Sequence, residues 1–287
     1  MLRGDGVDLH LTVWPGEGKP VLCIHGLTAN CRNWDSIAGA LMPDHLVMAV
    51  DLRGRGHSEQ PPSGYDIDHH CRDIENLVRD LGLESLALMG HSLGAIIALA
   101  FAVKHPEQVE RVILVDGGAQ LSKSESEKII QSIGGSLARL GKVFPSFEIY
   151  CESIQKAAYL QPWLPSMNVF FKHDVEVLEE GVRSRIQATA IEQELSNLQK
   201  FDVSELYPQV CCPVLILRAA NGMQSQDAVL ISDAALEKML DEIEDARCVD
   251  IQGVNHYTIM FQDSKRRDQA IRAFLSGQPL RCRVRST

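Results

Sequence analysis

Residues 86–100 read LALMGHSLGAIIALA: an apolar run, a serine between two glycines, and a second apolar run. The first run is typical of a buried strand and the second of a buried helix, which predicts that Ser92 stands on the sharp turn between them. Side chains at Gly90 and Gly94 would collide there with the neighbouring strand and helix. Such a turn is strained, and it would lift the Ser92 hydroxyl above the sheet edge, beside a helix N-terminus that favours negative charge. The alternative is an ordinary helix start with Ser92 as its N-cap.

Strand-like and helix-like runs alternate through the first half of the chain, which predicts a parallel sheet covered by helices on both faces. The expected strands are 9–14, 21–24, 46–50, 86–89 and 111–115, and the expected helices are 34–42, 67–81 and 93–104. From residue 119 to 206 no strand is evident, and helical periodicity appears at 124–133, 147–158 and 175–190. The sheet is expected to resume at 213–217 and 247–251.

Polar motifs follow four of these strands in a recognisable order. They are His25-Gly26, the stretch DLRGRGHS over 51–58, GHSLG over 90–94 and GVNH over 253–256. With these motifs the chain resembles the α/β-hydrolase superfamily of serine hydrolases. The resemblance implies an α/β-hydrolase fold in which residues 1–118 and 207–287 form the core and residues 119–206 form an inserted helical cap. An insertion of this length is too long for a bare loop.

Composition restricts the partners and the compartment. The chain is 45% hydrophobic and 23% charged, with a net charge of −10, and its basic residues cluster only at Arg281, Arg283 and Arg285. We therefore expect no nucleic-acid partner. No apolar stretch reaches the roughly 18–20 residues of a membrane span, and no secretory signal is visible, so no membrane partner is expected. The eight cysteines fall mostly in apolar runs, which indicates reduced thiols and a cytoplasmic protein of open oligomeric state.

The sequence contains no recognised cofactor motif. Neither C-x-x-C nor H-E-x-x-H spacing occurs, so no metal site is expected, and no G-x-G-x-x-G follows the first strand. The stretch 51–58 combines glycine and arginine but lacks the spacing of a phosphate-binding loop, and we interpret it as a structural turn of the core.

A serine nucleophile needs a histidine base, and the histidine in turn needs an acid. The resemblance assigns the base to His256. Family members usually carry the acid after the strand at 213–217, but here no carboxylate follows until Asp227. Some α/β-hydrolases, haloalkane dehalogenases among them, carry it after the preceding strand, and that position is Asp116. We favour Asp116, with Asp227 as the alternative; Asp250 lies inside a strand and fits less well.

The remaining site residues also come from the resemblance. The backbone amides of Leu27 and Leu93 are expected to form the oxyanion hole. Tyr257, Met223 and His25 are expected to contact substrate, and His25 also to shape the loop beside the nucleophile.

These features predict a cofactor-free serine carboxylesterase that acts on small to medium acyl esters. The same triad would serve a lactonase, a C–C bond hydrolase or a thioesterase, because pocket shape decides among them. A serine at the turn argues against dehalogenase and epoxide hydrolase chemistry, which in this family depends on an aspartate there. A more distant alternative is a non-catalytic binding protein with a hydrolase-like fold.

Overall fold

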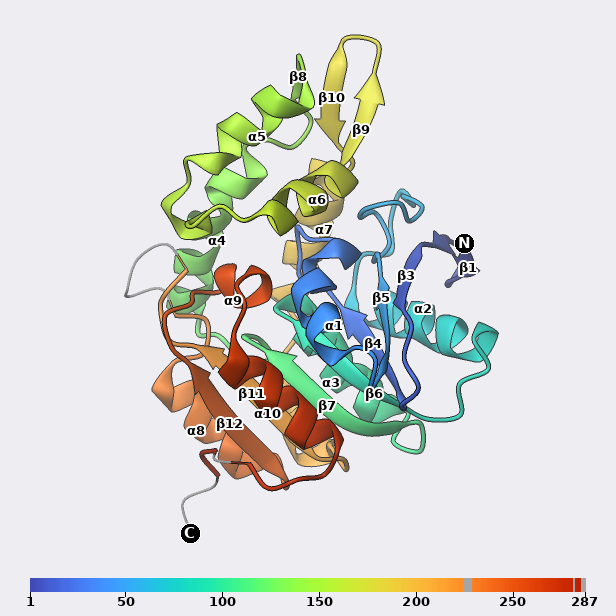
Figure 1. The fold of residues 1–287 in the computed structure, drawn as a ribbon, viewed down its shortest axis with the longest axis vertical. Coiled ribbons are helices and arrows are strands. Elements are labelled where there is room, and N and C mark those ends of the chain that lie inside the picture. Colours follow the sequence, from blue (N-terminus) through green and yellow to red (C-terminus); the bar gives the residue numbers. More distant parts are fainter. Residues whose placement is uncertain (224–228, 281, 285–287) are drawn as a thin grey trace.

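A computed structural model describes residues 1–223, 229–280 and 282–284. Its centre is a seven-stranded sheet in the order β12-β11-β7-β6-β4-β5-β3 (Figure 1). All neighbouring strands pair in parallel except β3 and β5, which are antiparallel. The strands are β3 (Leu11–Trp14), β4 (Pro20–Ile24), β5 (Leu46–Val50), β6 (Leu86–His91), β7 (Val109–Val115), β11 (Val214–Ala219) and β12 (Ala246–Ile251). The mostly parallel sheet expected from the apolar runs is confirmed.

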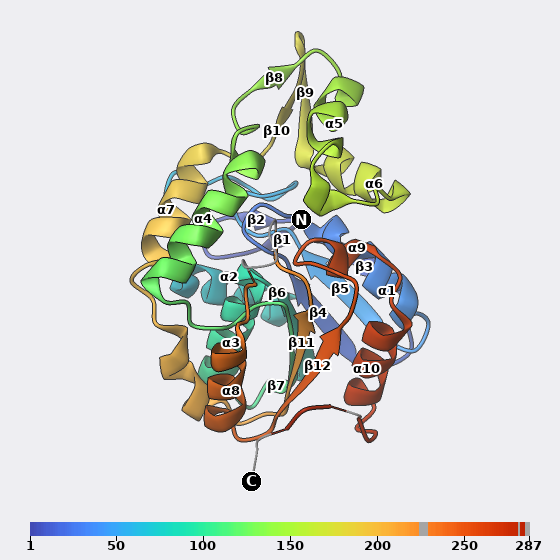
Figure 2. The same cartoon turned by 90° about the vertical axis from the view of Figure 1, so that its left-hand side faces the viewer.

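Helices cover both faces of this sheet (Figure 2). Alternate side chains of each strand point to opposite faces: Leu22 and Ile24 belong to one buried cluster, whereas Val21 and Cys23 belong to the other. One face carries α2 (Ile67–Asp80), α3 (Leu93–Lys104) and α8 (Asp233–Glu242), and the other carries α1 (Asp35–Leu41), α9 (Thr258–Phe261) and α10 (Lys265–Leu275). Two short elements complete the N-terminal half: the hairpin of β1 (Leu2–Arg3) with β2 (Asp8–Leu9), and the 3-10 turn η1 (Cys31–Trp34).

The inserted segment, residues 119–206, connects β7 to β11, and most of it lies beyond the carboxyl ends of the parallel strands (Figures 1 and 2). Its helices are α4 (Lys123–Leu137), α5 (Phe147–Gln155), α6 (Pro165–Asp174) and α7 (Ala188–Leu198), with the 3-10 turn η2 (Ala158–Leu160). A further 3-10 turn, η3 (Val203–Gln209), leads back to the core and packs against α3 and α8. The inserted segment also contains a three-stranded antiparallel sheet of β8 (Val143–Phe144), β10 (Gly181–Ser184) and β9 (Val175–Leu178).

The expectation of a strand-free segment with a helix over 175–190 was therefore wrong. Residues 175–184 form a hairpin, in which Val177 pairs with Val182. The turn depends on Gly181, whose φ of 143° suits only glycine, and β-branched valines favour the flanking strands. Val177 is 84% exposed, so part of the apolar pattern read as a helix face belongs to a solvent-facing strand.

Across the described residues, no helix combines the length and the apolar character that crossing a bilayer requires. All eight cysteines are described, and each is a free thiol.

Candidate active site

Ser92 occupies a strained turn between β6 and α3. Its φ of 56° and ψ of −118° lie in a region that L-residues rarely adopt. A Cβ on Gly90 would stand 2.1 Å from the Gly94 carbonyl oxygen, and one on Gly94 would stand 2.0 Å from the Ile24 carbonyl oxygen. Both glycines are therefore required by close backbone contacts, as expected. The Ser92 side chain makes no capping hydrogen bond to α3, so the reading of an ordinary N-cap was wrong.

Asp116 and His256 form a buried pair although 140 residues separate them. His256 Nδ1 lies 2.8 Å from Asp116 Oδ2, and Asp116 Oδ1 accepts a hydrogen bond of 3.0 Å from the Ala219 amide. Asp116 directly follows β7, and its φ of 43° turns the chain sharply there. Since Nδ1 faces the carboxylate, Nε2 is the nitrogen left to meet a hydroxyl, the arrangement that a serine triad uses.

Asp227 and Asp250 were the other carboxylates considered as the acid partner of His256. Asp227 lies outside the described residues. Asp250 on β12 pairs with Arg218 of β11 at 2.7 Å and with Arg283 of the C-terminal segment at 2.9 Å, so its carboxylate is used by these two arginines.

Sequence reasoning missed the role of His91 in holding His256. The two rings stack with centroids 4.5 Å apart, and His91 Nε2 lies 3.0 Å from the His256 carbonyl oxygen. Burial, followed by electrostatic interaction with the His256 imidazole, lowers the pKa of His91 well below its usual value, so the His91 ring is neutral. Nε2–H donates to the carbonyl, and Nδ1 is left to accept from the Asn33 amide at 3.4 Å. No sequence pattern signals this contact, because the x of G-x-S-x-G is free to vary.

The expected oxyanion residues Leu27 and Leu93 line the same cavity as Ser92. Leu93 is the first residue of α3, where backbone amides have no partner within the helix. The carbonyl of Leu27 accepts a 3.0 Å hydrogen bond from Arg55 Nε, and Arg55 Nη2 pairs with the buried Glu194 of α7 at 2.9 Å. The stretch 51–58 was interpreted as a structural turn of the core, and through Arg55 it also fixes the Leu27 loop.

A cavity of about 590 Å³ lies between the core and the inserted segment. Ser92 and His256 line it from the core, and helices α4, α6 and α7 line it from the inserted segment. Its apolar lining includes Leu27, Ile96, Ile129, Ile130, Ile133, Phe170, Phe171, Leu195, Leu198, Phe201 and Phe261. Tyr257 and Met223 also line the cavity, as expected.

His25 is not among the cavity-lining residues, and its expected contact with substrate is corrected here. Its side chain is fully buried, with Nδ1 2.8 Å from the Gly26 carbonyl oxygen and Nε2 accepting from the Leu52 amide at 3.0 Å. Burial lowers the pKa of His25 to about 4, so the ring is neutral and both nitrogens are used by backbone. The residue shapes the loop beside Ser92, which was the other role expected of it.

Known proteins match both the sequence and this architecture. A sequence profile of the alpha/beta hydrolase fold matches residues 19–149. The chain therefore has the α/β-hydrolase fold. It is 28% identical over 244 residues to a 2-(acetamidomethylene)succinate hydrolase of Mesorhizobium japonicum, covering 84% of this chain and 83% of that protein. The crystal structure of an E-2-(acetamidomethylene)succinate hydrolase superposes with a TM-score of 0.82 at 25% identity, covering 94% of this chain and 96% of the other.

A second relative matches this chain over a shorter range. A 3-hydroxybutyrate-oligomer hydrolase of Cupriavidus necator is 32% identical over 177 residues, which are 61% of this chain and 57% of the relative.

Proposed function

We propose that this hydrolase is a serine carboxylesterase that acts on small to medium acyl esters through an acyl-enzyme. The observation that carries the proposal is the Asp116–His256 pair beside the strained Ser92, at the wall of an apolar cavity. The resemblance to a hydrolase of 3-hydroxybutyrate oligomers supports it, because a hydroxy acid oligomerises through ester bonds. Eight free cysteines support a cytoplasmic location as part of the same proposal.

In the proposed mechanism, the Ser92 hydroxyl attacks the ester carbonyl while His256 Nε2 takes its proton. Asp116 keeps the imidazole in the required tautomer and stabilises the imidazolium. The Leu27 and Leu93 amides donate to the oxyanion of the tetrahedral intermediate. His256 then protonates the leaving alcohol, and water attacks the acyl-enzyme by the same route.

A second candidate is hydrolysis of a carboxylate-bearing amide. It is favoured by the similarity to 2-(acetamidomethylene)succinate hydrolase over 84% of the chain and by a guanidinium at the cavity. Arg139 lines the cavity, and its Nη2 lies 3.5 Å from Asp174, long enough for a substrate carboxylate to compete for it. The predominantly apolar lining favours the ester reading instead.

The test is turnover of p-nitrophenyl esters from acetate to palmitate, alongside 2-(acetamidomethylene)succinate, by wild type, Ser92→Ala and Arg139→Gln. The proposal expects turnover that declines with acyl length, survives in Arg139→Gln and falls about 10⁶-fold in Ser92→Ala. If wild type prefers 2-(acetamidomethylene)succinate and this preference disappears in Arg139→Gln, the second candidate would replace the esterase proposal.

A fluorophosphonate probe tests the serine without choosing a substrate. It should label wild type and not Ser92→Ala. Absence of labelling in the folded wild type would favour the non-catalytic alternative.

A further inference from the structure

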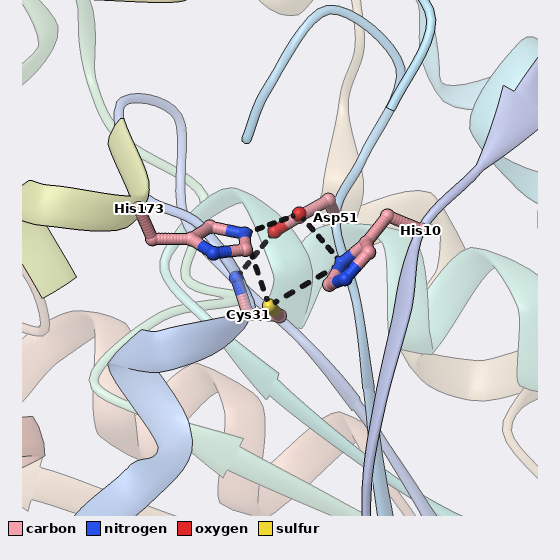
Figure 3. Close-up of side chains that lie close together, drawn as sticks. All are labelled: His10, Cys31, Asp51 and His173. Atoms are coloured by element: carbon pink, nitrogen blue, oxygen red, sulfur yellow. Dashed lines mark hydrogen bonds and ion pairs between the residues drawn. The ribbon is translucent and has the colours of Figure 1, made fainter. Parts of the chain in front are cut away.

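Four side chains that can each ligate a metal converge on one point (Figure 3). They are His10 between β2 and β3, Cys31 at the start of η1, Asp51 directly after β5, and His173 on α6. Their ligand atoms all lie within 4.8 Å of one another. None of the four is among the residues that line the cavity.

We propose that His10, Cys31, Asp51 and His173 bind a divalent transition metal of the zinc type, which fastens the inserted segment to the core. This departs from the absence of a metal site expected from sequence spacing. Three ligands come from the core and the fourth, His173, from the inserted segment.

The donor set suits zinc. Imidazole, thiolate and carboxylate are all ligands that zinc accepts, whereas magnesium and calcium prefer oxygen alone. Cys31 and Asp51 are fully buried, while the side chain of His10 is 29% exposed, which gives an ion a way in. Four protein ligands close the coordination sphere, as expected of a structural site and not of a catalytic one.

The distances are close to those of a tetrahedral site. Bonds of 2.0–2.3 Å place neighbouring ligand atoms about 3.3–3.6 Å apart. Cys31 Sγ already lies 3.5 Å from His173 Nε2 and 3.8 Å from His10 Nδ1. Asp51 Oδ2 lies 2.9 Å from His10 Nδ1 and 2.7 Å from His173 Nε2, so the carboxylate would move by about 0.5 Å to admit the ion.

Surrounding groups hold the carboxylate in place. Asp51 Oδ1 accepts from the Cys31 amide at 2.6 Å, which leaves Oδ2 to face the histidines, where the His57 amide also donates to it at 2.9 Å. Gly56, with φ of 52°, lets the 51–58 turn wrap closely, since a Cβ there would lie 2.2 Å from Asp51 Oδ2. Such outer contacts orient ligands in known metal sites.

The alternative is a Cys–His–Asp nucleophile, and the geometry disfavours it. A proton relay needs the histidine to use one nitrogen toward sulfur and the other toward the carboxylate. His173 uses Nε2 toward both Cys31 and Asp51. Ligand atoms that converge in this way point to a shared ion.

Metal uptake by the purified full chain tests the proposal without reference to its activity. Cobalt(II) absorbance and zinc content should show one ion per chain, with a thiolate-to-cobalt band that disappears in Cys31→Ser. The partly exposed His10→Gln should weaken binding by more than the about 10–100-fold typical of a lost outer contact. Zinc should also raise the Tm of wild type.

Two matched variants serve as controls. Cys211→Ser removes an exposed thiol, and His69→Gln removes an imidazole on α2; both should keep the band and the affinity. No stoichiometric uptake by wild type, the same band in Cys31→Ser, or a band lost in Cys211→Ser would each overturn the assignment. Circular dichroism verifies that each variant is folded. If Cys31→Ser does not fold, the loss of affinity in His10→Gln still decides the test.

Discussion

Asp116 and Asp51 each follow a parallel strand of the same sheet, and each faces histidine, yet the two sites are built differently. Asp116 meets Nδ1 of a single histidine, whose other nitrogen is left for the cavity where Ser92 lies. Asp51 meets two histidines through one oxygen, with a sulfur beside both. An aspartate–histidine pair can relay a proton only when the second nitrogen of the histidine is free for another partner. Where two histidines contact one carboxylate oxygen, as at Asp51, the contact instead holds separate segments together.

Among substitutions at or near these two aspartates, the largest effect is expected for Asp116. Asp116→Asn removes the charge that stabilises the imidazolium, and kcat on the best ester should fall about 10⁴-fold while the protein stays folded. Steady-state kinetics and circular dichroism measure the two parts. Near-full activity in Asp116→Asn, together with a large loss in Asp227→Asn, would transfer the acid role to Asp227.

A second prediction concerns a buried carboxylate that has a purely structural role. Burial alone would raise the pKa of Glu194, but His70 and Arg55 lower it to about 2. Because the folded pKa lies below the unfolded one, the stabilisation is present above pH ~4.5 and is lost as pH falls toward ~2. Glu194→Gln should cost about 3–5 kcal/mol at neutral pH, since it leaves the Arg55 charge buried and unpaired.

Urea unfolding from pH 7 down to pH 3 measures this effect. Wild type should lose stability steeply below pH ~4.5, and Glu194→Gln should lose less over the same interval. Parallel pH curves for the two proteins would contradict the assignment.

A smaller effect probes the cavity. Ile133 on α4 lines it, and Ile133→Trp should lower kcat/KM for the longest accepted ester by about 10-fold, or ~1.4 kcal/mol, with less effect on acetate. Ile149→Trp on α5 is the matched control, because Ile149 is 44% exposed and is not among the cavity-lining residues. An equal loss on every chain length would argue against the acyl group occupying this region.

The smallest effect belongs to the Asp51 cluster in the metal-free protein. His173→Gln removes one hydrogen bond to Asp51, worth about 1 kcal/mol, and should lower Tm by roughly 2–4 °C in the presence of a chelator. Zinc should widen the gap between wild type and variant. A gap that stays the same with and without zinc would leave the cluster a hydrogen-bonded junction only.

The sequence predicted the core well because its information is local. Most strands end directly before a polar motif, and the family resemblance then assigned roles to Ser92, His256 and Asp116 from the order of those motifs. The hairpin at 175–184 was missed because four-residue strands with one exposed face resemble a helix face in a short window. The cluster at Asp51 was missed because its ligands come from four separated segments with no recognised spacing.

Hydrogen bonds join the two ends of the inserted segment, where the chain leaves the core and returns to it. The Tyr207 hydroxyl donates to the Gly118 carbonyl at 2.7 Å and accepts from the Gln120 amide at 3.0 Å, while Gln120 Oε1 accepts from the Val203 amide at 2.9 Å. The two ends of the segment thus lie side by side and are held there by these hydrogen bonds. A change in the length of the chain between these two ends therefore need not displace β7 and β11, the strands that precede and follow the segment.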